Sequence, residues 1–284
     1  MKQMFKKHKL LILSIGLFTI FGIIGLGLFC YNLINLSTIP NIKSAASQIL
    51  PSPENTTYAK VEKYRVPILM YHYIRIAPQT DKLGTKLSVT PSDFDTQLKY
   101  FKDQNYTTIH MADLADPNKK EISKAYGEGK KPLVITFDDG YQDAYDNALP
   151  ILSKYQFNAT FYVIQDKIGQ PNYLTQDEID KLKKAGMEIG SHGLEHLDLT
   201  KMNPLEARRQ IFNSKRNTQV FCYPSGKYNV MIAGLVQQAG YLNAVTTNDG
   251  LASQNSNLFE MPRIRMSNTP FDKLKEKIDD TKTI

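Results

Sequence analysis

Short apolar runs alternate with amphipathic stretches through most of the chain after about residue 65. A continuous apolar run of about 4–8 residues, bounded by polar or turn-forming residues, is typical of a strand buried on both faces. Stretches in which apolar residues recur every three or four positions are typical of surface helices. The predicted strands are 66–71, 106–109, 133–137, 159–164, 187–190, 220–223 and 242–246. The predicted helices are 91–105, 144–155, 175–185, 204–217 and 230–239.

The regular alternation of these elements predicts the fold class. Thr90 or Ser92 can cap the helix that begins near residue 91, and Gly186 follows the end of another helix. Strands that alternate with helices form parallel sheets. We therefore expect an α/β protein built as a closed or nearly closed (β/α) barrel of about seven parallel strands, with its chemistry where the strands end.

A different pattern occupies the N-terminus. No charged residue occurs between Lys9 and Lys43, and the segment 10–36 is dense in Leu, Ile, Phe and Gly. As a helix this segment would rise about 40 Å, enough to cross a hydrocarbon core of about 30 Å with some tilt. We expect one transmembrane helix that keeps the lysine-rich tail 1–9 in the cytoplasm and places the rest of the chain outside the cell.

The exported part divides into two stretches. Residues 37–64 carry several prolines among Ser, Thr and Asn, which is typical of a stalk. Residues 65–284 are long enough for one α/β domain with its own core. The alternative to a membrane anchor is a cleaved signal peptide, which would release the domain as a secreted protein. The apolar region of a signal peptide is only about 7–15 residues long, so the anchor is favoured.

Charge and cysteine content narrow the function classes. The chain carries 35 Lys and Arg against 28 Asp and Glu, a net charge of +7, and four of the lysines lie in the first ten residues. The remainder is nearly neutral, which excludes an evenly basic nucleic-acid binder. Cys30 lies in the predicted membrane segment and Cys222 is the only later cysteine, so no disulfide can form within the exported part. We expect this domain to be a monomer.

An acidic pair follows the predicted strand 133–137. The run Thr-Phe-Asp-Asp-Gly places Asp138 and Asp139 together at the end of that strand. Two adjacent carboxylates held there are costly unless a positive charge balances them. A divalent metal would balance them, with one carboxylate as a ligand and the other as a base. A solvated acid pair in an Asp-Asp-Gly turn is the alternative.

Histidines gather at the same predicted rim. His192 and His196 stand four residues apart just after the strand 187–190, while His72 and His110 follow or end two other predicted strands. One Asp and two His form a three-ligand site with an open position for water, the arrangement of catalytic rather than structural zinc. An exposed histidine pair without a metal is the alternative. Co, Ni or Mn would suit the same ligands.

Together these motifs resemble a known family. The Thr-Phe-Asp-Asp-Gly run, the run Ser-His-Gly-Leu-Glu-His at 191–196 and the α/β alternation are similar to polysaccharide deacetylases of the NodB-homology type, carbohydrate esterase family 4. The resemblance covers roughly residues 66–265. It implies a distorted barrel and metal-dependent removal of acetyl groups from N-acetylated sugars. It further implies that Asp138 is the general base and that Asp139, His192 and His196 bind the metal.

The third family motif is altered in this chain. The stretch Phe-Cys-Tyr-Pro-Ser-Gly at 221–226 has Cys222 where the motif has arginine. Tyr223 and Ser225 remain candidates for substrate or oxyanion binding. The residue that orients Asp138 must come from elsewhere, and Arg263 or Arg265 are the candidates.

The family's general acid is usually a histidine near the C-terminus. This chain has no histidine after His196, so the acid must come from another position. The run Ile-Leu-Met-Tyr-His at 68–72 resembles the start of the poly-β-1,6-N-acetylglucosamine deacetylases, in which a permuted barrel supplies the acid from the first strand. The resemblance implies His72 as the acid, with His110 as a competitor. It favours a biofilm exopolysaccharide as substrate. Peptidoglycan, an O-acetylated xylan and a non-catalytic glycan-binding role are the alternatives.

Overall fold

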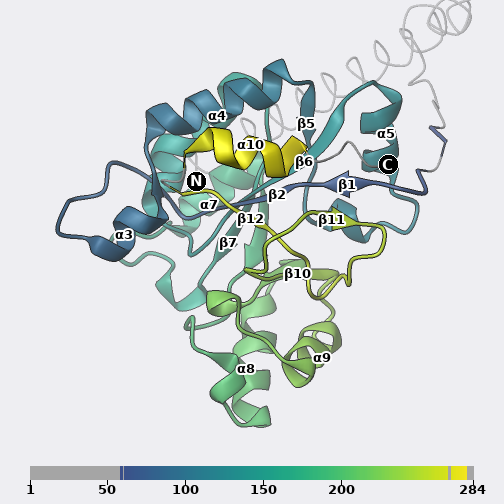
Figure 1. Cartoon of the computed structure of the whole chain (residues 1–284). Helices are drawn as coiled ribbons and strands as arrows, with labels where there is room; N and C mark the ends of the chain where they lie inside the picture. The colour runs from purple at the N-terminus through teal and green to yellow at the C-terminus, as the bar shows by residue number, and fades with distance from the viewer. Residues whose placement is uncertain (1–57, 60, 268–269, 280–284) are drawn as a thin grey trace, which may run out of the picture. The chain divides into compact units, whose positions relative to one another are not determined.

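Seven parallel strands form the central sheet, in the order β10-β9-β8-β7-β6-β2-β12 (Figure 1). The computed structural model of the protein describes residues 58–59, 61–267 and 270–279. The strands of this path are β2 (Ile68–Tyr71), β6 (Lys131–Phe137), β7 (Thr160–Val163), β8 (Glu188–Ser191), β9 (Val220–Cys222), β10 (Asn243–Val245) and β12 (Ile264–Arg265). They curve into a half-barrel with β10 and β12 at its edges. This confirms the predicted α/β class and the parallel arrangement, but the sheet is not the closed or nearly closed barrel that we expected.

One segment connects the two edges of this half-barrel. The N–H of Ala244 in β10 donates to the carbonyl of Leu258, and the N–H of Met261 donates back to Ala244. A few residues later the same segment becomes β12, which pairs with β2 at the other edge. Residues 258–265, which we call the closing segment, therefore contact both edges of the sheet.

The predicted strand near residue 106 has a different place from the one expected. β5 (Tyr106–Thr108) pairs only with the first residues of β6, Lys131 to Leu133, and lies off the main path. β12 takes the seventh position instead. The pattern could not predict β12, because two residues are too few to show an apolar run and Pro262 precedes them.

The five predicted helices are present in the structure. They are α4 (Pro91–Asp103), α6 (Leu149–Tyr155), α7 (Gln176–Lys184), α8 (Pro204–Lys215) and α9 (Val230–Gln238). The expected cap of α4 is Thr90, whose hydroxyl accepts from the N–H of Asp93. In α7, Thr175 and Glu178 form a capping box, and Gly186 with φ +82° follows the end. The predicted helix 144–155 begins instead with a π-helical turn, η2 (Ala144–Ala148).

Several short elements were not predicted. The additional helices are α3 (Lys82–Leu87), α5 (Lys120–Gly127) and α10 (Phe271–Asp279). The additional strands are β1 (Arg65–Val66), β3 (Tyr73–Ile74), β4 (Ser88–Val89) and β11 (Ala252–Ser253). Short 3-10 turns are η1 (Ala112–Ala115), η3 (Gln165–Lys167), η4 (Leu199–Lys201) and η5 (Pro224–Gly226).

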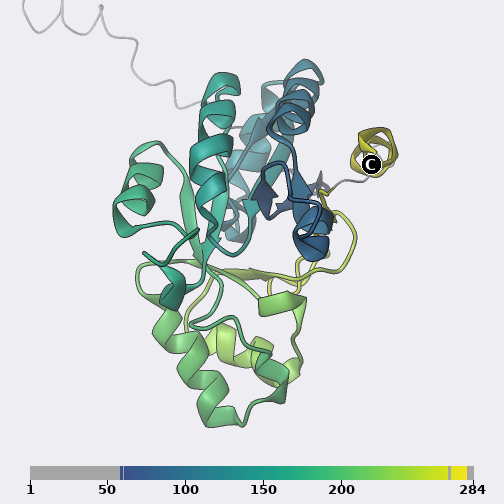
Figure 2. The same ribbon diagram turned by 90° about the vertical axis from the view of Figure 1, so that its left-hand side faces the viewer.

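The helices lie around the sheet and bury its outer face (Figure 2). Ile135 and Phe137 of β6 belong to a core cluster that includes residues of α4 and α6. Val134, from the same strand, packs with Ile68 and Tyr162 in a separate cluster. Because successive residues of a strand point to opposite faces, the side chains at 134, 136 and 138 share the inner face of the half-barrel.

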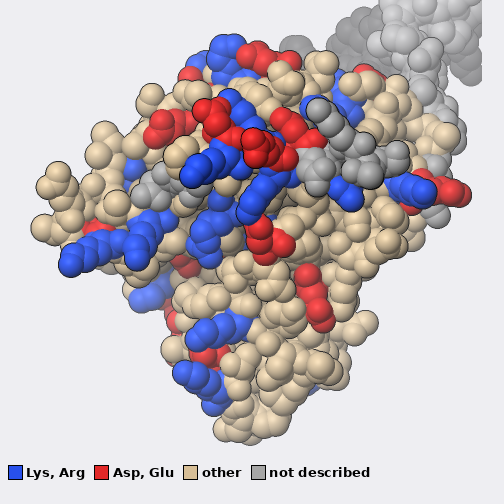
Figure 3. Space-filling model, in the orientation of Figure 1, with Lys and Arg blue, Asp and Glu red and all other residues tan. Residues whose placement is uncertain are grey.

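Within the described residues, no helix has the length and apolar character needed to cross a membrane. The predicted tail 1–9, the predicted membrane segment 10–36 and the stalk up to residue 57 lie outside the described residues. The last residues assigned to the stalk pack on the domain: Tyr64 is buried, and its N–H donates to the Gln254 side chain. The packed part therefore begins before residue 65. On the face in Figure 3, basic and acidic side chains are interspersed.

Candidate active site

A pocket of about 460 Å³ opens where the strands of the half-barrel end. His72 follows β2, Asp138 and Asp139 follow β6, and His192 follows β8. Ser225 lies after β9, in the turn η5. Carboxyl ends of parallel strands meet at one rim, which is why motifs far apart in the sequence line this single pocket.

Asp138 is held by a buried arginine. The Asp138 side chain points into the half-barrel, where Nη1 and Nη2 of Arg263 donate to its two oxygens at 2.7 Å each. Both residues are almost fully buried, with 3% and 1% of their surface exposed. Burial opposes the charge of Asp138, but the guanidinium outweighs it, so the pKa of the carboxyl is held well below its usual range. Asp138 is therefore an ionised carboxylate held in a fixed position.

The remaining donors of Arg263 are also satisfied. Nε donates to the carbonyl of Thr246 at 2.9 Å, and Nη1 donates to the Thr136 hydroxyl at 3.0 Å. Nη2 lies 3.4 Å from Sγ of Cys222. Of the two sequence candidates for orienting Asp138, Arg263 makes the contact, whereas Arg265 is exposed and lines the pocket.

Asp139, His192 and His196 converge on one point. Oδ1 of Asp139 lies 3.4 Å from Nε2 of each histidine. Nδ1 of His192 is 2.8 Å from the carbonyl oxygen of Cys222, so it is the protonated nitrogen and Nε2 carries the lone pair. Asp139 and His196 both have positive φ, +72° and +60°, a conformation that aims their side chains at a cost in backbone strain.

This trio fits a divalent metal. Its ligand atoms lie within 4.8 Å of one another, as the donors of a single ion must. A second group, Asp138, His192 and Cys222, is as compact. However, the Arg263 guanidinium already occupies both oxygens of Asp138, and burial raises the pKa of the Cys222 thiol, which therefore stays neutral. Asp139, His192 and His196 therefore form the better candidate for a metal site.

His72 follows β2, which lies on the other side of β6 from β8 in the sheet. Its Nε2 is 3.8 Å from Oδ2 of Asp138, and its buried Nδ1 has no partner among the described residues. Burial lowers the pKa of His72, and the carboxylates of Asp138 and Asp139 offset this only in part. A protonated imidazole with a lowered pKa is a stronger acid, which suits proton donation.

Two other sequence candidates are placed away from the pocket. Nε2 of His110 is 3.0 Å from the carbonyl of Gly186, which precedes β8, so His110 lies at the start of the strands and is not the acid. The reason is that β5 pairs with the beginning of β6 and ends far from the rim. Tyr223 is fully buried, its N–H donating to Val245 and its hydroxyl to Phe259, so the prediction that it contacts substrate was wrong.

Sequence reasoning missed part of the pocket wall. Tyr141, Tyr173, Lys167 and Thr247 also line it. Only Tyr141 carried a signal, because it follows the Asp-Asp-Gly run directly. The others come from loops without periodic patterns.

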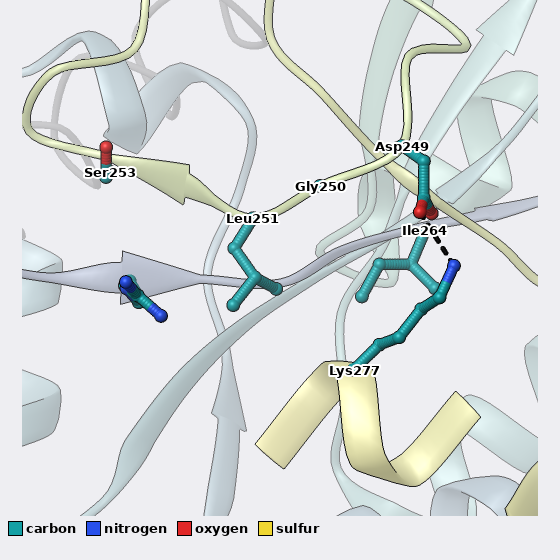
Figure 4. A pocket seen from close by; sticks show the side chains of 7 residues that line it. Asp249, Gly250, Leu251, Ser253, Ile264 and Lys277 are labelled. Atoms are coloured by element: carbon teal, nitrogen blue, oxygen red, sulfur yellow. Dashed lines mark hydrogen bonds and ion pairs between the residues drawn. The ribbon is translucent and has the colours of Figure 1, made fainter. Parts of the chain in front are cut away.

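A second pocket, of about 380 Å³, is lined by Arg65 of β1, Ile264 of β12, Lys277 of α10 and the residues Asp249, Gly250, Leu251 and Ser253 (Figure 4). Its facing acid and base, Asp249 and Lys277, pair with each other at 2.7 Å. Because Asp249 and Lys277 pair with each other, this pocket lacks the convergent ionisable groups that line the pocket of Asp138 and His192.

Comparison with known proteins agrees with this geometry. The family model described as polysaccharide deacetylase matches residues 125–244. A Bacillus subtilis protein, YxkH, whose description assigns it to the polysaccharide deacetylases, is 32% identical over 236 residues, which cover 78% of this chain and 79% of the relative. The chain belongs to the polysaccharide deacetylase family.

Two further relatives extend the comparison. The solved structure of Streptococcus pyogenes deacetylase PplD in complex with acetate is similar with a TM-score of 0.66 and 32% identity, over 76% of this chain and 98% of that one. A Staphylococcus aureus poly-β-1,6-N-acetyl-D-glucosamine N-deacetylase is 25% identical over 68% of this chain and 72% of its own length. As a polysaccharide deacetylase, the protein is a hydrolase of amide bonds in an acetylated glycan, and enzymes of this family depend on a metal.

Proposed function

We propose that this polysaccharide deacetylase is a zinc-dependent N-deacetylase of N-acetylglucosamine units, acting on poly-β-1,6-N-acetylglucosamine outside the cell. The main support is the contact between Asp138 and Arg263. It keeps a carboxylate ionised and fixed beside the compact trio of Asp139, His192 and His196. That arrangement suits hydrolysis of an unactivated amide, which needs an ionised base held in place against the attacking water.

Asp139, His192 and His196 would hold the metal, and the carbonyl of Cys222 fixes the His192 ring for that task. When bound, zinc supplies Lewis acidity, which lowers the pKa of a water from 15.7 toward about 7 and polarises a carbonyl. The mixed oxygen and nitrogen donors suit zinc, and Co, Ni or Mn would also fit.

Asp138 takes the proton of the attacking water at Oδ1 or Oδ2. Arg263 fixes both oxygens, so the base needs no rearrangement during the reaction. The turn η5 places Ser225 at the pocket with φ +55°, and we assign its backbone N–H to the oxyanion. His72 then protonates the leaving amine through Nε2, the nitrogen that faces Asp138.

The substrate assignment rests on three observations. The relative at 25% identity is named for the β-1,6-linked polymer. His72 follows β2, the strand in which the resembling branch carries its acid. The predicted membrane segment 10–36 would tether the domain outside the cell, where exopolysaccharide is made and modified.

Acetate release tests the activity. The zinc-loaded full chain should release acetate from acetylated β-1,6-linked polymer faster than from peptidoglycan fragments. Asp138→Asn should retain the metal and lose at least about 100-fold in turnover, the usual contribution of a general base. Asp146→Asn, the same change at an exposed site, serves as the control. Full activity of Asp138→Asn would refute the assignment of the base, and faster release from peptidoglycan would refute the substrate.

The membrane anchor is a separate proposal with its own test. We infer a single-pass protein with a cytoplasmic N-terminus, because four lysines precede the uncharged segment. In intact cells, external protease should digest the domain, and the N-terminal peptide should remain in the membrane fraction. A mature protein that begins after residue 45 would instead establish signal cleavage.

A further inference from the structure

Three tyrosines from separate segments gather beside the metal ligands. The rings of Tyr73 and Tyr141 stack with centroids 3.8 Å apart and an interplanar angle of 18°. The ring of Tyr173 lies 5.3 Å from that of Tyr141, tilted by 34°. Tyr141 directly follows the Asp-Asp-Gly turn, and both Tyr141 and Tyr173 line the catalytic pocket. We call these three residues the tyrosine stack.

Backbone hydrogen bonds fix the stack to the metal-binding loop. The N–H of Leu174 donates to the carbonyl of Gly140 at 2.9 Å, and that of Gln142 donates to Asn172 at 2.9 Å. Tyr141 and Tyr173 thereby form an isolated antiparallel bridge. The loop that carries Tyr173 is consequently held at a set position relative to Asp139.

The inner end of the stack is braced by a cation. The guanidinium carbon of Arg75 lies 3.8 Å from the Tyr73 ring centroid, and Arg75 pairs with Asp81 at 2.6 Å. This leaves Tyr173 as the outer ring of the stack. All three rings are only partly buried, unlike the stacked pair Tyr223 and Tyr228, whose inner member is fully buried. Because these rings are already ordered and partly exposed, a ligand that binds on them would lose little side-chain entropy.

We propose that Tyr173, backed by Tyr141, stacks on the sugar unit next to the one being deacetylated. This inference rests on the proposed function and adds a specificity-determining site to it. One face of a pyranose ring is lined by C–H bonds, which pack on an aromatic ring, while its hydroxyls point sideways to polar partners. The chain has no tryptophan, so tyrosine fills this role.

Binding to a catalytically inactive chain tests the stack without turnover. The probe is an acetylated β-1,6-linked glucosamine pentamer, titrated by calorimetry into the zinc-loaded full chain carrying Asp138→Asn. Adding Tyr173→Leu should weaken binding about 5- to 20-fold, whereas Tyr173→Phe, which keeps the ring, should stay within about threefold. The single-unit N-acetylglucosamine should bind the parent and the Leu variant equally.

The absence of tryptophan permits a direct optical test. Tyr173→Trp creates a protein with one tryptophan, which keeps the stacking surface and reports on its surroundings. Its fluorescence should shift as pentamer is added, with the same midpoint as in calorimetry. Tyr155→Trp is the matched control, because Tyr155 is also partly buried but ends α6 and packs on Phe157, away from the pocket.

The outcomes separate the stack from the proposed function. If the parent binds pentamer and Tyr173→Leu binds it equally well, with no fluorescence change in Tyr173→Trp, the stack is refuted while the function stands. If the parent binds no pentamer of either β-1,6 or β-1,4 linkage, both proposals fail. Weaker binding by Tyr173→Leu, with an unchanged melting temperature and a fluorescence shift in Tyr173→Trp, would support the stack.

Discussion

Arg263→Met should disable the enzyme by leaving Asp138 without its partner. The substitution keeps much of the arginine's volume but removes two hydrogen bonds of 2.7 Å and the balancing charge. Breaking a buried ion pair from one side costs about 3–5 kcal/mol. That is a large part of a typical stability of about 5–15 kcal/mol. The free energy of unfolding should therefore fall by about this amount in guanidinium titrations of the metal-free protein at pH 7.

The loss of activity follows from the same contact. Burial raises the pKa of a carboxyl, so the pKa of Asp138 should rise once the guanidinium no longer opposes it. A larger fraction of the molecules would then carry a protonated Asp138, which cannot act as a base. Acetate release should fall at least tenfold. Arg208→Met is the control, because Arg208 is exposed on α8, lies over the Phe212 ring and does not line the pocket, so the change should cost less than about 1 kcal/mol.

Two double variants make the reasoning refutable. Arg263→Met with Asp138→Asn should recover most of the lost stability, because no buried charge remains. Cys222→Arg with Arg263→Met should recover part of the activity, because the Cys222 side chain lies only 3.4 Å from the position of the guanidinium. Cys222→Arg alone should destabilise the protein by crowding two cations. If Arg263→Met retains both stability and activity, or if neither double variant differs from it, the pairing does not control Asp138.

Three further predictions concern metal, pH and the excluded histidine. Zinc at 100 times its dissociation constant should raise the melting temperature of the parent by about 5–10 °C over that in EDTA, measured by calorimetry. His192→Ala should abolish this rise. Burial raises the pKa of Asp143 to about 6, so the folded protein binds the extra proton, and the free energy of unfolding should fall as pH rises from about 4 to about 6. Asp143→Asn should remove this loss, so the stability of the variant relative to the parent should grow by about 2 kcal/mol across that range in urea titrations. If the difference in stability does not change with pH, the assignment is wrong. His110→Ala should cost about 1 kcal/mol of stability and leave the rate of acetate release within twofold of the parent. A loss of activity above tenfold would show that His110 belongs to the active site.

The sequence contained most of the fold because its elements are locally encoded. The strands β2, β6 and β7 are largely apolar and buried on both faces. Thr90 and the Thr175–Glu178 box mark helix starts that the structure retains. β12 and α3 are too short for a periodic signal, and their positions depend on contacts with distant residues. Such elements cannot be predicted from a window of sequence.

The candidate site shows the same division. Asp138, Asp139, His192 and His196 were identifiable, because each pair is contiguous or spaced within one turn and follows a predicted strand. The choice of Arg263 over Arg265 was not, because the two flank Ile264 and share one face of the strand. Only their depth separates the buried Arg263 from Arg265, which is exposed and lines the pocket. Tyr223 was predicted to bind substrate from its place in the third motif. Its hydroxyl, however, donates to the carbonyl of Phe259 and does not reach the pocket.

The closing segment connects the integrity of the barrel with the ionisation of its base. Residues 258–265 hydrogen-bond to β10 on one side, pair with β2 on the other and carry Arg263 between these contacts. Any opening of this segment would withdraw the guanidinium from Asp138, and the buried carboxyl would then take up a proton. With arginine in the third motif, the partner of the base would come from a regular strand of the sheet. With Cys222 at that position, the base stays ionised only while the half-barrel is closed by this segment.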